Sequence, residues 1–287
     1  FRSRIARTDI INRTRIKDDG EIFGVTVNDL KQAYQLRKGL DLLGVMRVKI
    51  PVWNETLEWS GTQYKPSEFI TSLEQIIKEV KTGENQPDIV GVFGSRLKIN
   101  ERITEKGILN IVDGDEKLWS PFFESTIYSY RTSIKVWQLG DDNDASFTND
   151  DRQQLLLNKL NPYLEKAGQV GAPSTILSNP DLVKKPLINH KWLMFNNFEY
   201  IDNLDFDELE GVLPKAQETF APKKWLTIPI KSNFSINNDL SASVDIIKKI
   251  VWARKNDIKR IFIANYQNEN NGLINHKNEV TPAFLSY

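Results

Sequence analysis

Acidic and amide side chains follow directly after a short hydrophobic segment in IKVWQLGDDNDASF, residues 134 to 147. The four consecutive residues are Asp141, Asp142, Asn143 and Asp144. Like charges this close repel one another, and the repulsion becomes tolerable where a strand end opens on solvent. Paired carboxylates at such an opening serve acid/base work on a glycosidic bond or hold a metal ion. The alternative is a solvated loop in which Asp142 or Asn143 caps the next helix.

The amino-acid composition limits the kinds of catalytic or metal site that these side chains could form. The 287 residues include no Cys, so disulfides, thiol nucleophiles and cysteine-ligated metals are excluded. Only His190 and His276 supply imidazoles, and the spacing of a calcium loop is missing after Asp141, so we predict no metal and no cofactor. Lys plus Arg equals Asp plus Glu at 38 each, which argues against nucleic acid as a partner.

Strand-like runs alternate with amphipathic stretches of helical length along most of the chain. The pattern predicts strands at 22–27, 45–53, 88–96, 135–141, 169–176, 192–201, 224–232 and 258–265. It predicts helices at 28–44, 65–83, 122–132, 149–168, 205–220 and 241–257, with Gly44 ending the first. Eight strands with intervening helices indicate an α/β fold of the (β/α)8 TIM barrel type. An open doubly wound sheet is the rival, but VTVNDLKQ after the first strand lacks the glycine-rich phosphate turn.

The amino end differs from the rest of the chain. Residues 1–20 are arginine-rich without clear periodicity, so we expect an arm or linker there and a barrel over residues 21–287. The chain begins at Phe1 without a signal-like segment, which suggests a piece of a longer protein with neighbouring domains. No apolar run approaches 18 residues, so no membrane span is expected in this segment.

The segment YRTSIKVWQLGDDND resembles the fourth-strand signature of the retaining glycoside hydrolases built on (β/α)8 barrels, in particular the β-xylosidase-like and endoglycanase-like members. Trp137, Gln138, Leu139 and Gly140 match that signature, whereas Asp141 replaces the usual Asn and Asp142 replaces the acid/base Glu. VMRVKIPVW is similar to the second strand of these enzymes, and NNGLINHKNEVTPAFLSY is similar to their last strand-to-helix segment. The resemblance covers about residues 21–287 and implies a glycosidase-like barrel with an oligo- or polysaccharide partner in an extracellular or periplasmic location.

The departures from this family pattern bear on activity. KKWLTIPI resembles the seventh strand, but Ile228 stands where the family has its nucleophilic Glu. Double displacement needs two carboxyl groups, so we expect a degenerate member that does not hydrolyse by the family mechanism. The active alternative is an inverting hydrolase with Asp142 as general acid and Glu199 or Asp144 as its partner. Glu199 could equally be a surface ion-pair residue.

A barrel without its nucleophile can still bind sugar through aromatic rings and polar groups. The expected substrate-binding residues lie in the loops or near the carboxyl ends of the strands, and they are Arg47, Trp53, Trp59, Arg96, Gln138, Asp141, Asn196, Lys231 and Tyr266. Tyr64 and Asn197 are further aromatic and polar groups in these regions. The resemblance implies Arg47 and Trp53 in particular. Lys231 could instead pair with Asp142 and neutralise the site, and Trp192, Trp225 and Trp252 are expected to fill the core. The sequence thus favours a carbohydrate-binding or interaction barrel, against a purely structural alternative that binds no glycan.

Overall fold

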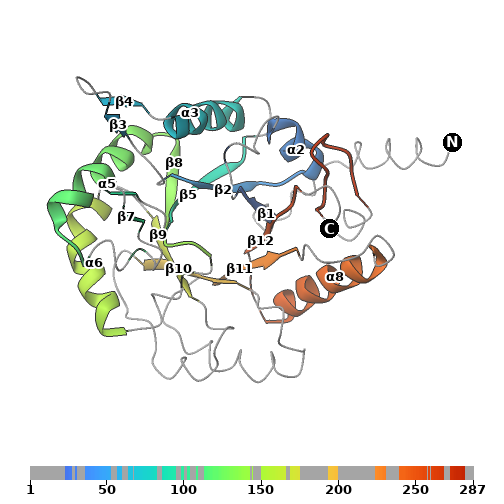
Figure 1. Cartoon of the computed structure of the whole chain (residues 1–287). Coiled ribbons are helices and arrows are strands. Elements are labelled where there is room, and N and C mark those ends of the chain that lie inside the picture. Colours follow the sequence, from blue (N-terminus) through green and yellow to red (C-terminus); the bar gives the residue numbers. More distant parts are fainter. Residues whose placement is uncertain are drawn as a thin grey trace.

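The strands of the computed structural model close into a single barrel (Figure 1). The strand order is β1-β12-β11-β10-β9-β8-β5-β2, every neighbouring pair is parallel, and β1 pairs with β2 to complete the ring. The structure describes residues 23–27, 30, 36–52, 57–59, 64–66, 68–82, 86–94, 98–99, 102–103, 108, 113–142, 144, 150–165, 169–174, 193–199, 224–230, 239–256, 258, 260–267 and 272–281. The predicted (β/α)8 barrel is confirmed, and the open sheet is excluded by the closing pair.

Each barrel strand overlaps a strand predicted from the sequence. They are β1 (Phe23–Thr26), β2 (Arg47–Pro51), β5 (Asp88–Phe93), β8 (Ile134–Leu139), β9 (Gln169–Ser174), β10 (Leu193–Glu199), β11 (Lys224–Pro229) and β12 (Arg260–Ala264). Two short antiparallel hairpins are inserted after β2 and β5: β3 (Leu57–Trp59) with β4 (Tyr64–Pro66), and β6 (Lys98–Ile99) with β7 (Arg102–Ile103).

The described helices surround the barrel: α2 (Leu36–Leu43), α3 (Glu68–Lys81), α5 (Glu116–Tyr130), α6 (Asp150–Leu164) and α8 (Asp239–Lys255). Gly44 ends α2 as predicted, with a φ of 65° and its N–H bonded to the Leu40 carbonyl. The helix predicted from 65 starts at Glu68, because Tyr64–Pro66 pairs with β3. The predicted helix at 205–220 and the arm at 1–20 lie outside the described residues. Among the described helices, none is long and apolar enough to span a membrane.

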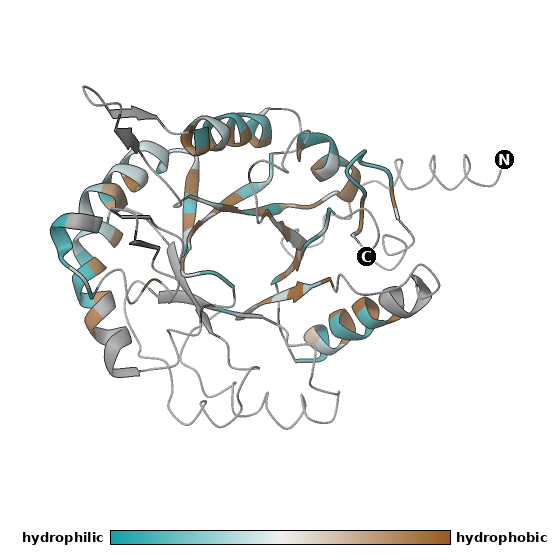
Figure 2. Ribbon diagram, viewed as in Figure 1, coloured by the Kyte–Doolittle hydropathy of each residue, from teal (hydrophilic) through white to brown (hydrophobic). Residues whose placement is uncertain are grey.

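Side chains of the strands divide into an outer and an inner layer. Hydrophobic residues on the outward faces of the strands pack against those of the helices. Figure 2 shows hydrophobic residues, in brown, both on the strands and on the helices around them. Leu226 and Ile228 of β11 belong to this outer cluster, together with Trp252 of α8. Trp225 belongs to a separate inner cluster with Val90, Val136 and Phe262. Trp225 and Trp252 are therefore core residues, as expected.

At the amino-terminal end of the barrel interior, two arginine side chains pack against the ring of Trp225. The guanidinium carbons of Arg47 and Arg260 lie 5.7 Å and 4.9 Å from the Trp225 ring centroid. Arg47 also pairs with Asp88 at 3.3 Å, and both residues open their strands. Arg47 was expected to reach a sugar at the carboxyl-terminal end of the barrel, and this expectation is corrected. Arg47 is the first residue of β2 and its side chain points inward, so it lies at the amino-terminal end of the barrel interior.

Candidate functional site

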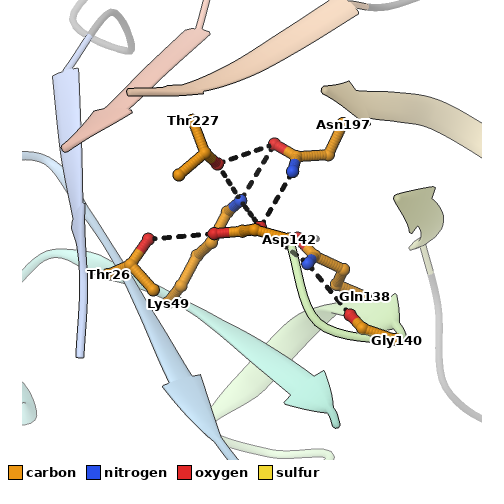
Figure 3. A network of polar contacts seen from close by, with 7 residues as sticks. All are labelled: Thr26, Lys49, Gln138, Gly140, Asp142, Asn197 and Thr227. Carbon is orange, nitrogen blue, oxygen red and sulfur yellow. Dashed lines mark hydrogen bonds and ion pairs between the residues drawn. The ribbon is translucent and has the colours of Figure 1, made fainter. Parts of the chain in front are cut away.

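The loop after β8 places Asp142 over the centre of the barrel (Figure 3). Gly140 adopts a φ of 84°, a conformation that favours glycine, and its N–H donates to the Phe93 carbonyl at 2.8 Å. The turn is closed by the Asp144 N–H, which donates to the Asp141 carbonyl at 3.0 Å. The glycine that matched the family signature therefore redirects the chain so that Asp142 faces the interior.

Asp142 is held by donors from four different strands. Its Oδ1 accepts from Lys49 Nζ at 2.6 Å, from Gln138 Nε2 at 2.8 Å and from Asn197 Nδ2 at 2.8 Å. Its Oδ2 accepts a longer hydrogen bond of 3.4 Å from Thr26 Oγ1. The Asp142 side chain keeps 12% of its surface exposed. One carboxylate oxygen is thus surrounded by N–H groups, while the other carries the weaker contact.

Lys49 supplies the positive charge of the site from a fully buried position. Its Nζ donates to Asp142 Oδ1, to Asn197 Oδ1 at 2.9 Å and to Thr227 Oγ1 at 2.9 Å. It also lies 4.3 Å from the centroid of the Phe262 ring. Three acceptors match the three hydrogens of an ammonium group. Because a buried charge is tolerated only when it is paired and hydrogen-bonded, this arrangement fixes Lys49 and Asp142 as one unit.

Amide and hydroxyl groups tie this ion pair to the barrel wall. Gln138 Nε2 donates to both Asp142 Oδ1 and the Gly140 carbonyl, the latter at 3.1 Å. The Asn197 side chain both donates and accepts hydrogen bonds. Its Nδ2 donates to Asp142, and its Oδ1 accepts from Lys49 and, at 3.2 Å, from Thr227 Oγ1. These contacts connect β2, β8, β10 and β11, so the site is a fixed polar centre supported on rigid strands.

The carboxylates of Asp141 and Asp144 have neighbours outside the network around Asp142. Asp144 is buried, with 5% of its surface exposed, and its Oδ2 accepts from the Ile108 N–H at 3.0 Å. Asp141 lies against Gly94, where an added Cβ would come within 2.5 Å of Asp141 Oδ1. Among the residues that the structure describes, no group of three or more His, Asp or Glu side chains could hold a metal ion.

The structure brings together some of the predicted site residues. Gln138 and Asn197 contact Asp142 directly. Tyr266 is buried in the outer core with 4% of its surface exposed, so it contributes to the packing of the barrel. The backbones of Trp59, Asn196 and Glu199 are described on β3 and β10, where Glu199 pairs in register with Thr227. Trp53, Arg96 and Lys231 lie outside the described residues.

Sequence reasoning missed three residues of the site: Lys49, Thr26 and Thr227. Lys49 takes the position beside Asp142 that was considered for Lys231. The signal was present, because Arg47 and Lys49 stand two residues apart in a hydrophobic strand and so share its inward face.

The residue of β11 that faces the site is Thr227, and Ile228 packs in the outer layer. The position expected to be a vacated nucleophile site therefore points away from Asp142. Successive residues of a strand point to opposite faces, so an offset of one residue decides which side chain reaches the interior.

Known structures share this fold at low sequence identity. A GH5-4 broad-specificity endoglucanase from Clostridium acetobutylicum is 14% identical, with a TM-score of 0.65 over 93% of this chain and 95% of that chain. A GH39 β-xylosidase from Caulobacter crescentus is 10% identical, with a TM-score of 0.60 over 94% and 70%. The cellulose synthase subunit Z from Clostridioides difficile is 12% identical, with a TM-score of 0.59 over 93% and 99%.

No protein-family model matches the sequence, and no curated protein sequence matches it. The structural likenesses establish the fold over most of the chain. The chain is a glycosidase-like (β/α)8 barrel, as its sequence resemblance indicated.

Proposed function

We propose that this barrel binds an oligo- or polysaccharide at the carboxyl ends of its strands and does not hydrolyse it by double displacement. The observation that carries the proposal is the ion pair between Lys49 and Asp142, buried at the point where a glycosidase-like barrel has its chemistry. Both charged groups are already bonded to protein atoms, so the centre is a preorganised receptor.

The contacts of Asp142 favour an acceptor role over that of a general acid. Three N–H groups point at Oδ1, so that oxygen can only accept. A retaining mechanism needs a second carboxyl group about 5 to 5.5 Å away. The inward residue of β11 is Thr227, a hydroxyl that already bonds Lys49. The fixed ammonium of Lys49 also disfavours the positive charge that develops on the sugar in the transition state.

The same geometry suits a neutral sugar hydroxyl. Asp142 Oδ2 and Thr26 Oγ1 share only a long 3.4 Å contact, and Asp142 is the partly exposed member of the network. A sugar hydroxyl can donate to Oδ2 and accept from Thr26 without breaking the bonds to Lys49. Because Lys49 and Asp142 offset each other's charge, the proposal favours neutral over acidic sugars.

Isothermal titration calorimetry tests this proposal with cellohexaose, mannohexaose and xylohexaose. Cellohexaose and xylohexaose follow the endoglucanase and the β-xylosidase among the structural neighbours, and mannohexaose adds a second neutral hexose chain. Thr26→Val removes one hydroxyl at nearly constant shape and should weaken binding by about five- to tenfold, the loss of one net hydrogen bond. Thr126→Val, at a buried position of α5, is the matched control and should leave the affinity unchanged.

Equal affinities for the wild type and Thr26→Val, or no binding of any probe, would contradict the proposed site. No binding is also what the structural-only alternative requires. Release of new reducing ends that disappears in Asp142→Asn would contradict the non-hydrolytic part of the proposal.

An inverting hydrolase with Asp142 as acid is the second candidate, and one observation favours it. Glu199 ends β10 in register with Thr227, at the same end of the barrel as Asp142. Asp144 has no such support, because it is buried and bonded to the Ile108 N–H. If this candidate holds, Glu199→Gln should abolish turnover of one of the three probes, and the released sugar should have inverted anomeric configuration by NMR.

A further inference from the structure

The helix α8, on the outside of the barrel in Figure 1, carries three exposed aliphatic side chains. Val244, Ile247 and Val251 are 41%, 43% and 61% exposed. They are three of the six large hydrophobic residues with high exposure in the described part of the chain. The other three are spread over α5, α6 and the last described segment. Exposed aliphatic surface is therefore concentrated on α8, and these three residues are called the α8 stripe below.

The α8 stripe points away from the barrel. An α-helix turns by about 100° per residue, so the three side chains lie within about 60° of one another around the helix axis. The side chains of Ile246 and Ala253, which are 3% and 0% exposed, lie on the opposite side of the helix and face the core. The α8 stripe therefore does not belong to the packing between the barrel and its helices.

The spacing of the α8 stripe is that of a coiled-coil seam. Val244, Ile247 and Val251 are separated by three and then four residues, which matches positions a, d and a of a heptad repeat. β-branched residues at position a are typical of two-stranded helix pairs. The next d position is Arg254, so the apolar seam ends there. The geometry suits one further helix that packs lengthwise on α8.

Basic side chains flank the α8 stripe. Lys248 and Lys255 occupy the e positions of the same heptads, and both are exposed, as is Arg254. The acidic residue nearby, Asp245, lies 2.6 Å from the ammonium of the buried Lys249 through its Oδ2. Charges at the e and g positions select the partner of a coiled-coil helix. The described flanks of the stripe are therefore positive and complementary to carboxylates.

We propose that the outward face of α8 binds an acidic amphipathic helix of a partner protein. Apolar side chains of that helix, at heptad spacing, pack on the α8 stripe, and its flanking carboxylates pair with Lys248 and Lys255. The inference is independent of sugar binding, because this face lies outside the barrel, whereas the polar centre around Asp142 lies within it. The seam is short, which is typical of weak and transient interfaces.

The same residues disfavour two other occupants. In an antiparallel pair of two copies of this chain, the lysines at the e positions would face one another. In a parallel pair they would face the g positions, which are Ser243 and Ile250, and gain no carboxylate partner. Helices that lie on anionic membranes present Trp, Phe or Leu on the apolar face, whereas the described exposed face of α8 presents Val and Ile.

Fluorescence anisotropy of two labelled peptides with the full chain tests the inference. Both synthetic peptides span about four heptads with Ile at a and Leu at d. The acidic peptide has Glu at e and g, and the basic peptide has Lys there, so that like charges keep each from pairing with itself. We expect the acidic peptide to bind at least about tenfold more tightly than the basic one. Equal binding of both peptides, or no binding of the acidic one, overturns the inference.

Variants at exposed positions locate the contact. Ile247→Ser should weaken binding of the acidic peptide by about tenfold, because it removes apolar surface from the seam. Lys248→Glu combined with Lys255→Glu should reverse the preference in favour of the basic peptide. Leu155→Ser, at an exposed position of α6, is the matched control and should bind like the wild type. An acidic peptide that binds Ile247→Ser and wild type equally overturns the inference.

Two further measurements distinguish the other occupants. Sedimentation velocity that shows a dimer of the wild type, and a monomer of Ile247→Ser, would assign the α8 stripe to a second copy and overturn the inference. Binding to phosphatidylserine vesicles that Ile247→Ser abolishes, without binding of the acidic peptide, would assign the stripe to a membrane surface and overturn it as well. A monomeric wild type that binds the acidic peptide and leaves the vesicles unbound supports the inference.

Discussion

Lys49 Nζ lies 2.6 Å from Asp142 Oδ1, although 93 positions separate the two residues in the chain. The contact joins the middle of β2 to the loop after β8 across the interior of the barrel. Because the ammonium is fully buried and the carboxylate is nearly so, each charge depends on the other. The pair therefore stabilises the fold and also sets the charge distribution of the site.

Removal of the ammonium should destabilise the protein strongly. Lys49→Met keeps most of the side-chain volume but leaves the Asp142 carboxylate without its cation, so the free energy of unfolding should fall by about 3 kcal/mol. Urea denaturation measures this change. Lys38→Met, at an exposed position of α2, should stay within about 0.5 kcal/mol of the wild type.

A further variant separates the charge effect from packing. Lys49→Met combined with Asp142→Asn removes both charges, so the double variant should recover part of the stability lost in Lys49→Met. A double variant less stable than Lys49→Met by the full cost of Asp142→Asn would show that the two residues are not coupled.

Replacement of Ile228 by Glu should not restore a nucleophile. Ile228 is fully buried in the outer core, so a carboxylate there would be desolvated without a described partner and should lower stability by about 3 kcal/mol or more. Val251→Glu, at a position of α8 that is 61% exposed, should change stability by less than about 0.5 kcal/mol. Urea denaturation and a reducing-sugar assay check both variants. A stable Ile228→Glu protein that hydrolyses an oligosaccharide would place Ile228 at the site after all.

Gly24 should not tolerate a side chain. A Cβ on Gly24 would lie 2.6 Å from Phe262 Cε1 and 3.0 Å from the Arg47 carbonyl oxygen. Gly24→Ala should therefore cost about 1 to 3 kcal/mol through overpacking of the barrel interior. Thermal or urea unfolding measures the loss, and adding Phe262→Leu should recover part of it.

Gly44→Ala provides the contrast. Nothing lies within 4 Å of a Cβ on Gly44, but its φ is 65°, so the substitution should cost about 1 kcal/mol through backbone conformation alone. Phe262→Leu should not rescue it. Equal rescue of both glycine variants would show that the contact with Phe262 is not the cause.

The buried phenol of Tyr266 and the half-buried phenol of Tyr130 should make the protein sensitive to alkaline pH. Burial raises the pKa of Tyr266 above its ordinary value, and burial, with the nearby charge of Glu74, raises the pKa of Tyr130 to about 12. The folded state therefore keeps protons that the unfolded state loses near pH 10. Their stabilising contribution is complete below pH 10 and is lost as the pH rises from there through the folded pKa values.

Urea denaturation at about pH 9 and about pH 11 measures this loss. Tyr266→Phe should show a smaller decrease between the two pH values than the wild type, whereas Tyr128→Phe, at an exposed position, should behave like the wild type. An identical decrease in Tyr266→Phe and wild type would exclude Tyr266 as a source of the pH dependence.

The order and approximate position of the eight barrel strands were determined by the sequence alone, whereas the two inserted hairpins were not predicted. Short aliphatic runs such as residues 88–93 and 258–265 are bounded by polar or glycine residues, and alternate with stretches of helical period. Gly44 marked the end of the first helix, where it has positive φ, whereas Gly140 was expected inside the strand at 135–141. These signals are local, because hydrophobic period and backbone preference act within a few residues. That is why the barrel and its outer core, including Trp252, could be predicted.

Only the tertiary structure decided which side chains meet Asp142. Lys49, Asn197 and Thr26 come from three other strands, and no local pattern states that they converge on one carboxylate. The assignment of Ile228 to the site was wrong by one residue of β11, and Arg47 lies at the right face but the wrong end of β2. Strand alternation sets a face only once the register of the closed barrel is known. The partner of a buried charge is then set by distance through space, which the chain order does not encode.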